Sequence, residues 1–248
     1  MKLTALATAC LALVISLGAT AQAGVTHVAV AANFTGPAKE IAALFKQQTG
    51  HEAVMSFGAS GAFFTEIAHG APFEVFLSAD EARPKAAVEQ GFAVPGSRFT
   101  YAVGQLVLWS RVVDVTDGEA ALKAGRFSKL SIANPVAAPY GAAAVQTMKA
   151  LGVYDALKPK IVEGNSIAQA FQFADTRNAE AGFVALAQLY GIKAGTRWEV
   201  PSSLYTPIRQ DAVLLKTGAA SEASKAFLAF LKSPEAHAII ERFGYALK

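Results

Sequence analysis

Apolar strand-like segments alternate with helix-like segments through the first ninety residues after an N-terminal leader. The pattern predicts three strand–helix pairs, at residues 25–32, 37–48, 52–57, 62–69, 74–77 and 78–90. Glycines follow the three helices at positions 50, 70 and 91, as is usual at helix ends. Strands that alternate with helices pair in parallel through right-handed crossovers. The order therefore predicts an open α/β layer fold.

The pattern changes near residue 98. Two extended runs, residues 98–103 and 105–112, are separated by Gly104. Alternation then resumes, with strands predicted at 130–133, 160–162 and 182–184, helices at 140–151 and 166–174, an extended run at 205–216, and helices at 222–231 and 233–243. We predict two lobes, the first made of residues 24–102 and 205–248 and the second of residues 103–204. One large doubly wound sheet is the alternative.

The first 23 residues have the three regions of a secretory signal peptide. Lys2 precedes an apolar run, and small residues end the segment at Ala21-Gln22-Ala23. A lipoprotein signal at Cys10 would leave almost no apolar run ahead of it. We therefore predict a signal peptide at residues 1–23 and a periplasmic location. The chain after it has no cysteine, so it uses neither disulfides nor thiolate metal ligands.

Composition excludes several classes of protein. The chain is 53% hydrophobic and 17% charged, which is enough apolar material for a large core. Removing Lys2 from the 22 basic residues leaves 21 against 19 acidic ones, a net charge of +2. This charge is too small and too scattered for nucleic-acid binding. No later apolar stretch reaches the roughly 18 residues of a membrane-spanning helix.

Four joints between a predicted strand and the next helix share one chemical character. They contain Asn33, Ser60, the triplet 138–140 (Ala-Pro-Tyr) and the triplet 165–167 (Asn-Ser-Ile). Such joints meet at the carboxyl edge of a parallel sheet, where ligands bind. All four offer uncharged donors, either side-chain amides and hydroxyls or the free N–H groups of a helix start. This set favours a fully deprotonated anion.

The same set discriminates among anions. Phosphate usually keeps a proton at neutral pH, and a cavity that holds only donors would leave that proton unpaired, at a cost of about 1–3 kcal/mol. Sulfate, molybdate and tungstate carry no such proton.

Each residue also has a plain structural interpretation, in which Asn33, Ser60 and Ser166 cap or turn the chain and Tyr140 is a surface aromatic.

The blocks around these joints resemble those of the periplasmic molybdate-binding proteins, the solute receptors of molybdate ABC importers. The resemblance covers nearly the whole chain after the leader and is carried by AANFTG, SFGASG, GAPFEVFLSADE, QGFAVPGSRFTYAVGQLVLWS, ANPVAAPYG, VEGNSIAQA and GFVALAQ. It implies a type II-like periplasmic-binding-protein fold with the ligand cleft between two lobes. By position, it implies that Asn33 and Ser60 bind the oxyanion from the first lobe, and Tyr140 and the N–H of Ile167 from the second.

The resemblance also implies that the chain is not an enzyme, needs no cofactor, acts as a monomer and delivers molybdate, with tungstate as a second ligand, to a membrane permease. One branch of the family has serine at the place of Asn33, a small residue at that of Tyr140, and tyrosine where this chain has Ala185. This sequence is similar to the other branch. Position 32, where that branch can carry a hydroxyl, is alanine here.

Three other functions fit parts of the sequence. A receptor for another tetrahedral dianion such as sulfate differs only in pocket radius. A serine hydrolase using Ser60 would need glycine two places later, where Ala62 stands, and a triad of Asp175 or Asp211 with His237. The four histidines show no metal-ligand spacing; they are His27, His51, His69 and His237.

Overall fold

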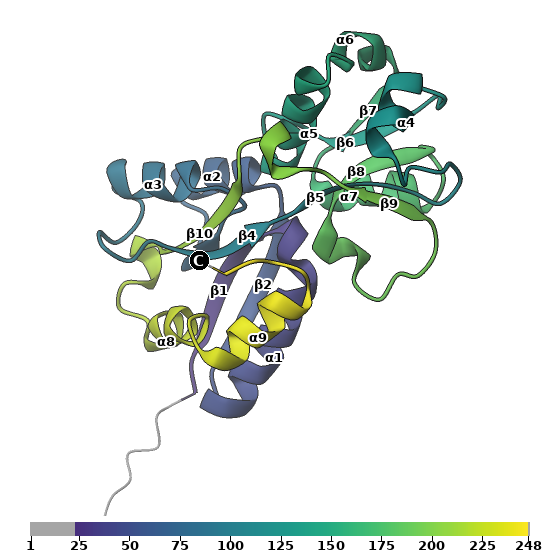
Figure 1. Ribbon diagram of the computed structural model, residues 1–248. Helices are drawn as coiled ribbons and strands as arrows, with labels where there is room; N and C mark the ends of the chain where they lie inside the picture. The colour runs from purple at the N-terminus through teal and green to yellow at the C-terminus, as the bar shows by residue number, and fades with distance from the viewer. Residues whose placement is uncertain (1–22, 248) are drawn as a thin grey trace, which may run out of the picture.

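The computed structural model describes residues 23–247. These residues form two five-stranded sheets, each with helices on both faces (Figure 1). The predicted signal peptide therefore lies outside the described residues, except for Ala23. We call each sheet with its helices a lobe. Within the described residues no helix is both long and apolar enough to span a membrane.

The sheet of the first lobe has the order β2-β1-β3-β10-β4. Its strands are β1 (Val25–Ala31), β2 (Glu52–Gly58), β3 (Val75–Leu77), β4 (Phe99–Gly104) and β10 (Ile208–Leu214). β1 pairs in parallel with β2 and β3, whereas β10 pairs antiparallel with both β3 and β4. One strand thus runs against the other four.

Helices cover both faces of this sheet. α1 (Thr35–Thr49), α8 (Glu222–Phe230) and α9 (Pro234–Arg242) lie on one face, and α2 (Ser60–Ala68) and α3 (Ala82–Glu89) on the other. α1 buries Ile41 and Phe45, which are four residues apart and therefore on one helix face. It ends at Gly50, whose φ of 75° only glycine adopts without strain.

The second lobe repeats this design. Its sheet has the order β7-β6-β8-β5-β9, in which β5 runs against the other four strands. The strands are β5 (Leu106–Ser110), β6 (Leu130–Ala133), β7 (Ile161–Gly164), β8 (Ala181–Ala185) and β9 (Thr196–Glu199). The helices are α4 (Gly118–Ala124), α5 (Pro139–Ala150), α6 (Tyr154–Leu157) and α7 (Ile167–Asp175). Short 3-10 turns are η1 (Ala32–Phe34), η2 (Lys158–Lys160), η3 (Leu186–Leu189), η4 (Ser202–Leu204) and η5 (Lys216–Gly218).

The chain passes between the lobes twice (Figure 1). β4 continues into β5 through Gln105, and the chain returns between β9 and β10. The predicted two-lobed α/β fold is confirmed, and the alternative of one large sheet is wrong because the strands form two sheets. Both sheets are mixed, since β10 and β5 are reversed. The lobe boundaries at residues 102 and 205 stay a prediction.

One expected detail differs from the structure. The third helix was predicted from residue 78, but α3 begins only at Ala82. Ser78 lies before the helix and is fully buried. The Asp80 carboxylate accepts the N–H of Arg83 in the first turn at 2.9 Å.

Candidate functional site

A small cavity lies where the strand–helix joints of both lobes meet. It is lined by Ala31, Ala32, Asn33, Gly58, Ala59, Ser60, Ala79, Ala138, Pro139, Tyr140 and Ile167. No lining residue is charged. The cavity's volume of about 10 Å³ is far below the roughly 300–1,000 Å³ of sites for organic ligands, so it is too small for an organic ligand. All four sequence-predicted site residues line it.

Ser60 is the first residue of α2 and is almost fully buried. Its hydroxyl oxygen accepts the backbone N–H of Ala79 at 2.9 Å and makes no capping bond, so the interpretation of Ser60 as a helix cap is wrong. Since the oxygen accepts there, the hydroxyl proton remains for an acceptor in the cavity. The Ser60 N–H, at the first helical position, has no intrahelical acceptor.

Tyr140 lies in the first turn of α5, directly after Pro139. It is 1% exposed, so the interpretation as a surface aromatic is wrong. Its hydroxyl reaches the first lobe, where the side-chain Nε2 of Gln210 donates to it at 3.4 Å. Gly104 permits this approach, because a Cβ there would lie 1.9 Å from the Tyr140 hydroxyl oxygen.

Ile167 is the first residue of α7, so its N–H also lacks an intrahelical acceptor. The preceding Ser166 accepts the N–H of Gln169 at 3.4 Å and caps the helix, as the structural interpretation of Ser166 predicts. The side chain of Gln188 connects this joint to β8 by two hydrogen bonds. It donates to the Ile167 carbonyl at 3.1 Å and accepts the N–H of Ala185 at 2.9 Å.

Asn33 follows β1 in the turn η1 and is 2% exposed. Its side chain does not cap a helix. Instead the amide nitrogen donates to Gln210 Oε1 at 2.7 Å and to the Tyr245 hydroxyl at 3.0 Å. Both amide protons are therefore engaged by the protein. The donor of Asn33 that remains for a ligand is its backbone N–H, among the first of the turn.

Sequence reasoning missed the residues behind this cavity. Gln210 and Tyr245 are buried and bond Asn33, and Tyr101 joins them by donating to Gln210 Oε1 at 3.2 Å. Gln210 stands between an arginine and an aspartate in the predicted extended run, so nothing in the sequence singled it out. Tyr245 follows the glycine that ends α9, a position that by itself indicates no function.

Burial keeps the phenols of this cluster protonated. It raises the pKa of Tyr140 well above the ordinary value of 10.0, and the nearby Tyr245 phenol raises it further. Burial likewise raises the pKa of Tyr101 and of Tyr245. Tyr140 is therefore a neutral hydroxyl at physiological pH and can donate its proton to an anion.

Contacts between the lobes lie on both sides of the cavity. The N–H of Gly61 donates to the Ala137 carbonyl at 2.9 Å, and Arg83 Nη2 donates to the Val136 carbonyl at 2.7 Å. On another side, the rings of Tyr190 and Phe243 are 4.2 Å apart between centroids. These contacts hold the two lobes together over the cavity.

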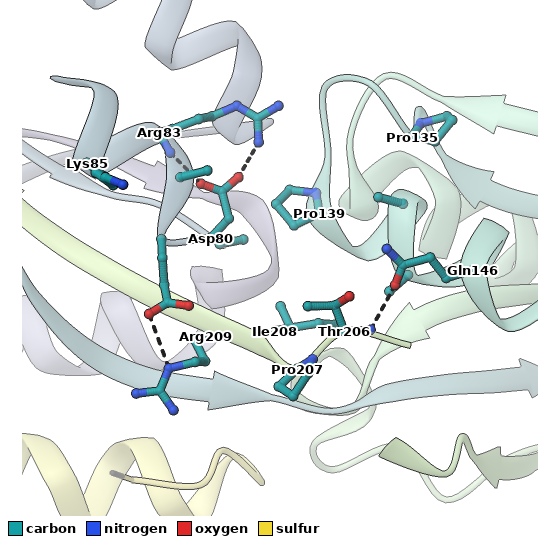
Figure 2. Close-up of a pocket in the computed structure, with 15 residues that line it drawn as sticks. Asp80, Arg83, Lys85, Pro135, Pro139, Gln146, Thr206, Pro207, Ile208 and Arg209 are labelled. Atoms are coloured by element: carbon teal, nitrogen blue, oxygen red, sulfur yellow. Dashed lines mark hydrogen bonds and ion pairs between the residues drawn. The ribbon is translucent and has the colours of Figure 1, made fainter. Parts of the chain in front are cut away.

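A larger groove of about 470 Å³ lies beside the cavity and shares Ala79 and Pro139 with it (Figure 2). Two ion pairs occupy it, Asp80 with Arg83 and Glu81 with Arg209. Because these arginines are already paired with carboxylates, the groove has little cationic character of its own. The cavity, with its unpaired donors, is the better candidate site.

The serine hydrolase and a metal site find no support in the described residues. The hydroxyl of Ser60 bonds a backbone N–H rather than a histidine. Asp211 pairs with Arg98 and Asp175 with Arg111, so neither carboxylate orients His237. Among residues 23–247, His, Cys, Asp and Glu form no group of three that could hold a metal ion.

Two α/β lobes joined by two chain crossings, with a cavity lined by uncharged donors between them, are the architecture of a receptor for a small solute. The chain belongs to the bacterial extracellular solute-binding protein family, whose model matches residues 26–246.

The chain is similar to known molybdate-binding proteins. ModA of Rhodobacter capsulatus is 58% identical over 235 residues, covering 95% of this chain and 93% of the relative. ModA of Azotobacter vinelandii is 52% identical over 245 residues, covering 95% and 97%. The solved structure of a periplasmic molybdate-binding protein of Azotobacter vinelandii superposes with a TM-score of 0.86 at 42% identity, covering 90% of this chain and 99% of that one.

The resemblance predicted from the sequence blocks is thus confirmed. The family consists of solute-binding components of transport, so the predictions of a solute-binding protein and of a chain that is not an enzyme are confirmed as well.

Proposed function

We propose that this chain captures molybdate, and also tungstate, outside the cytoplasm and delivers it to an ABC importer. The observation that carries the proposal is the small cavity lined by uncharged donors from both lobes. Its ligands are the hydroxyls of Ser60 and Tyr140 and the N–H groups of Asn33, Ser60 and Ile167. Relatives named for molybdate binding, up to 58% identical, support the same ligand.

The strength of binding follows from these groups. About five hydrogen bonds to a charged acceptor, at roughly 1.5–3 kcal/mol each, sum to about 7.5–15 kcal/mol, which is of the order of the roughly 8–12 kcal/mol of micromolar to nanomolar binding. The helix starts add positive potential without a formal charge. A donor-only cavity binds a fully deprotonated dianion and leaves the proton of hydrogen phosphate without an acceptor.

The same proposal places the mature protein in the periplasm. The signal peptide at residues 1–23 directs export, and the monomeric receptor docks on the membrane permease of the importer. The metal is held only through its oxo groups, so the protein needs no metal ligands and no cofactor. Lobe closure, using residues 24–102 with 205–248 against 103–204, encloses the anion.

Calorimetric titration of the chain from Gly24 onward tests this function. We expect tight one-to-one binding of molybdate and of tungstate, and no heat from phosphate. Sulfate is the main competitor, since it differs from molybdate in radius and not in protonation. Preference for sulfate, or binding of an amino acid, would contradict the proposal.

A further inference from the structure

A directed chain of hydrogen bonds lies behind the cavity, and Gln210 in β10 is its centre. Gln210 is fully buried. Its Oε1 accepts from Asn33 at 2.7 Å, and its Nε2 donates to the Tyr140 hydroxyl at 3.4 Å. Gln210 therefore contacts one candidate ligand residue from each lobe.

The direction of these bonds begins at Tyr245. Its hydroxyl donates its only proton to the backbone carbonyl of Asn33 at 2.8 Å, so toward the Asn33 side chain it can only accept. The Asn33 amide nitrogen donates to that hydroxyl and, with its second proton, to Gln210 Oε1. With its oxygen committed to Asn33, the Gln210 amide presents its nitrogen to Tyr140. The hydroxyl oxygen of Tyr140 thus accepts from Gln210, and its own proton is available to the Tyr245 hydroxyl beside it or to an anion in the cavity.

With the Gln210 amide in the reverse orientation, Tyr140 could not donate its proton to a ligand. If the Gln210 amide turned by 180°, its nitrogen would face the Asn33 nitrogen, donor against donor, and its oxygen would accept the Tyr140 proton. Asn33 would have to turn as well, which would remove the donor that the Tyr245 hydroxyl accepts. The observed direction gives both Asn33 amide protons and Gln210 Oε1 a partner.

The backbone of β10 and β4 leaves room for this arrangement of side chains. The pairing of β10 with β4 is irregular between Gln210 and Asp211, and such bulges re-aim side chains. On β4, a Cβ at Gly104 would lie 2.7 Å from Gln210 Nε2 and 1.9 Å from the Tyr140 hydroxyl. Only glycine at position 104 leaves room for both groups.

We infer that Gln210 is a positioning residue for the oxyanion site, which turns the Tyr140 hydroxyl proton into the cavity and the Asn33 amide away from it. This inference rests on the proposed function and adds to it. It makes Tyr140 and Ser60 the side-chain donors, whereas Asn33 contributes through its backbone.

A double-mutant cycle tests the inference. Molybdate affinity is measured for the wild type, Gln210→Met, Tyr140→Phe and the double variant. We expect each single variant to raise Kd by about tenfold or more, because each removes an oriented donor to a charged acceptor. The double variant should bind within about twofold of Tyr140→Phe, because Gln210 acts through the Tyr140 proton. Effects that multiply would overturn the inference.

Gln105, which lies between β4 and β5, offers a matched control. Gln105 Nε2 donates to the backbone carbonyls of Val200 at 2.7 Å and Leu106 at 3.1 Å and contacts no candidate ligand. Gln105→Met should keep Kd within about twofold of the wild type while thermal unfolding of the empty protein reports any loss of stability. An equal rise of Kd in both methionine variants would overturn the inference.

A second variant covers the case in which a methionine variant does not fold. Gln210→Glu keeps the side-chain shape, but its carboxylate only accepts and draws the Tyr140 proton away from the cavity. We expect its Kd to rise at least as much as in Gln210→Met, and wild-type affinity would overturn the inference. A wild type that does not bind molybdate refutes the proposed function, whereas a binding wild type with multiplying effects refutes only the role of Gln210.

Discussion

Ser60 and Ser166 both stand at the start of a helix, yet their hydroxyls bond different partners. Ser166 accepts the N–H of Gln169 in its own helix, α7, and so caps it. Ser60 accepts the N–H of Ala79, from a loop of the neighbouring β3–α3 connection. The acceptor side of Ser60 is therefore satisfied from outside its helix, and its proton is available to a ligand.

Replacing Ser60 with alanine should weaken molybdate binding by about 1–3 kcal/mol, since a hydroxyl donor to a charged acceptor is lost. Calorimetry measures this loss. The variant also loses stability, because the Ala79 N–H loses its acceptor.

Ser233→Ala is the matched control. Ser233 accepts the N–H of Ala236 at 3.2 Å and caps α9, and no atom of it lines the cavity. Its loss should cost about 1 kcal/mol of unfolding free energy and leave Kd within about twofold. If both serine variants lose stability and neither loses affinity, Ser60 is not a ligand.

The four candidate residues could be placed at one cavity from the sequence because each lies in a joint between a strand and the next helix, and parallel strands end at one edge. The supporting network could not. Asn33 bonds Gln210 across 177 residues and Tyr245 across 212. Such pairings depend on the reversed strand β10 and on the C-terminal segment after α9, whose positions no local pattern specifies.

At the scale of elements, periodicity predicted the longer strands and helices to within a few residues. It missed β9, α4 and α6, which have only 4, 7 and 4 residues. Segments this short show at most two turns or two alternations, so their periodicity is not distinct. The reversal of β5 and β10 was not predicted either, because strand direction follows from the chain crossings between lobes rather than from the strands' own residues.

The loop between β6 and α5 is the element that contacts the opposite lobe. Asn134 Oδ1 accepts the N–H groups of Val136 and Ala137, both at 3.0 Å, which directs the loop's carbonyls outward. The carbonyl of Val136 then accepts from Arg83, and that of Ala137 from Gly61. The loop thus joins the two lobes through two hydrogen bonds.

Arg83→Ala should weaken the connection between the lobes. Loss of one hydrogen bond, worth about 0.5–1.5 kcal/mol, lowers the closed population and raises Kd by about 2–10-fold, mainly through faster dissociation. Stopped-flow release of molybdate measures the rate. Lys85→Ala is the control, because Lys85 pairs with Glu89 on the same helix and makes no contact with the second lobe. Equal release rates in the two variants would mean that Arg83 does not hold the lobes closed.

For the whole molecule, the cavity and the core are continuous. One apolar cluster includes Ala31, Ala32, Ala59 and Ala79 of the first lobe together with the core of the second. The two lobes are therefore packed together around the cavity. A ligand that binds only the folded, closed form stabilises it by about 2.7 kcal/mol at a hundred times its Kd.

Alkaline pH should act on the whole fold through the buried phenols. Burial raises the pKa of Tyr101, Tyr140 and Tyr245 above the value of about 10 that tyrosine has in an unfolded chain. Below about pH 10 both states keep these protons, so the stability is fully present. Above it the unfolded chain releases protons that the folded protein retains, and the free energy of unfolding falls with rising pH.

Each buried phenol contributes a slope of at most about 1.4 kcal/mol per pH unit, and the three together about 4. Urea unfolding at intervals from pH 8 to pH 11 measures the slope. Tyr101→Phe removes one phenol, so its stability should fall less steeply above pH 10 even though it starts lower at pH 8. Molybdate affinity should stay constant across pH 8 to 10, because the Tyr140 hydroxyl keeps its proton there. A free energy of unfolding that does not change between pH 10 and 11 would show that these phenols ionise as readily in the folded protein as in the unfolded chain.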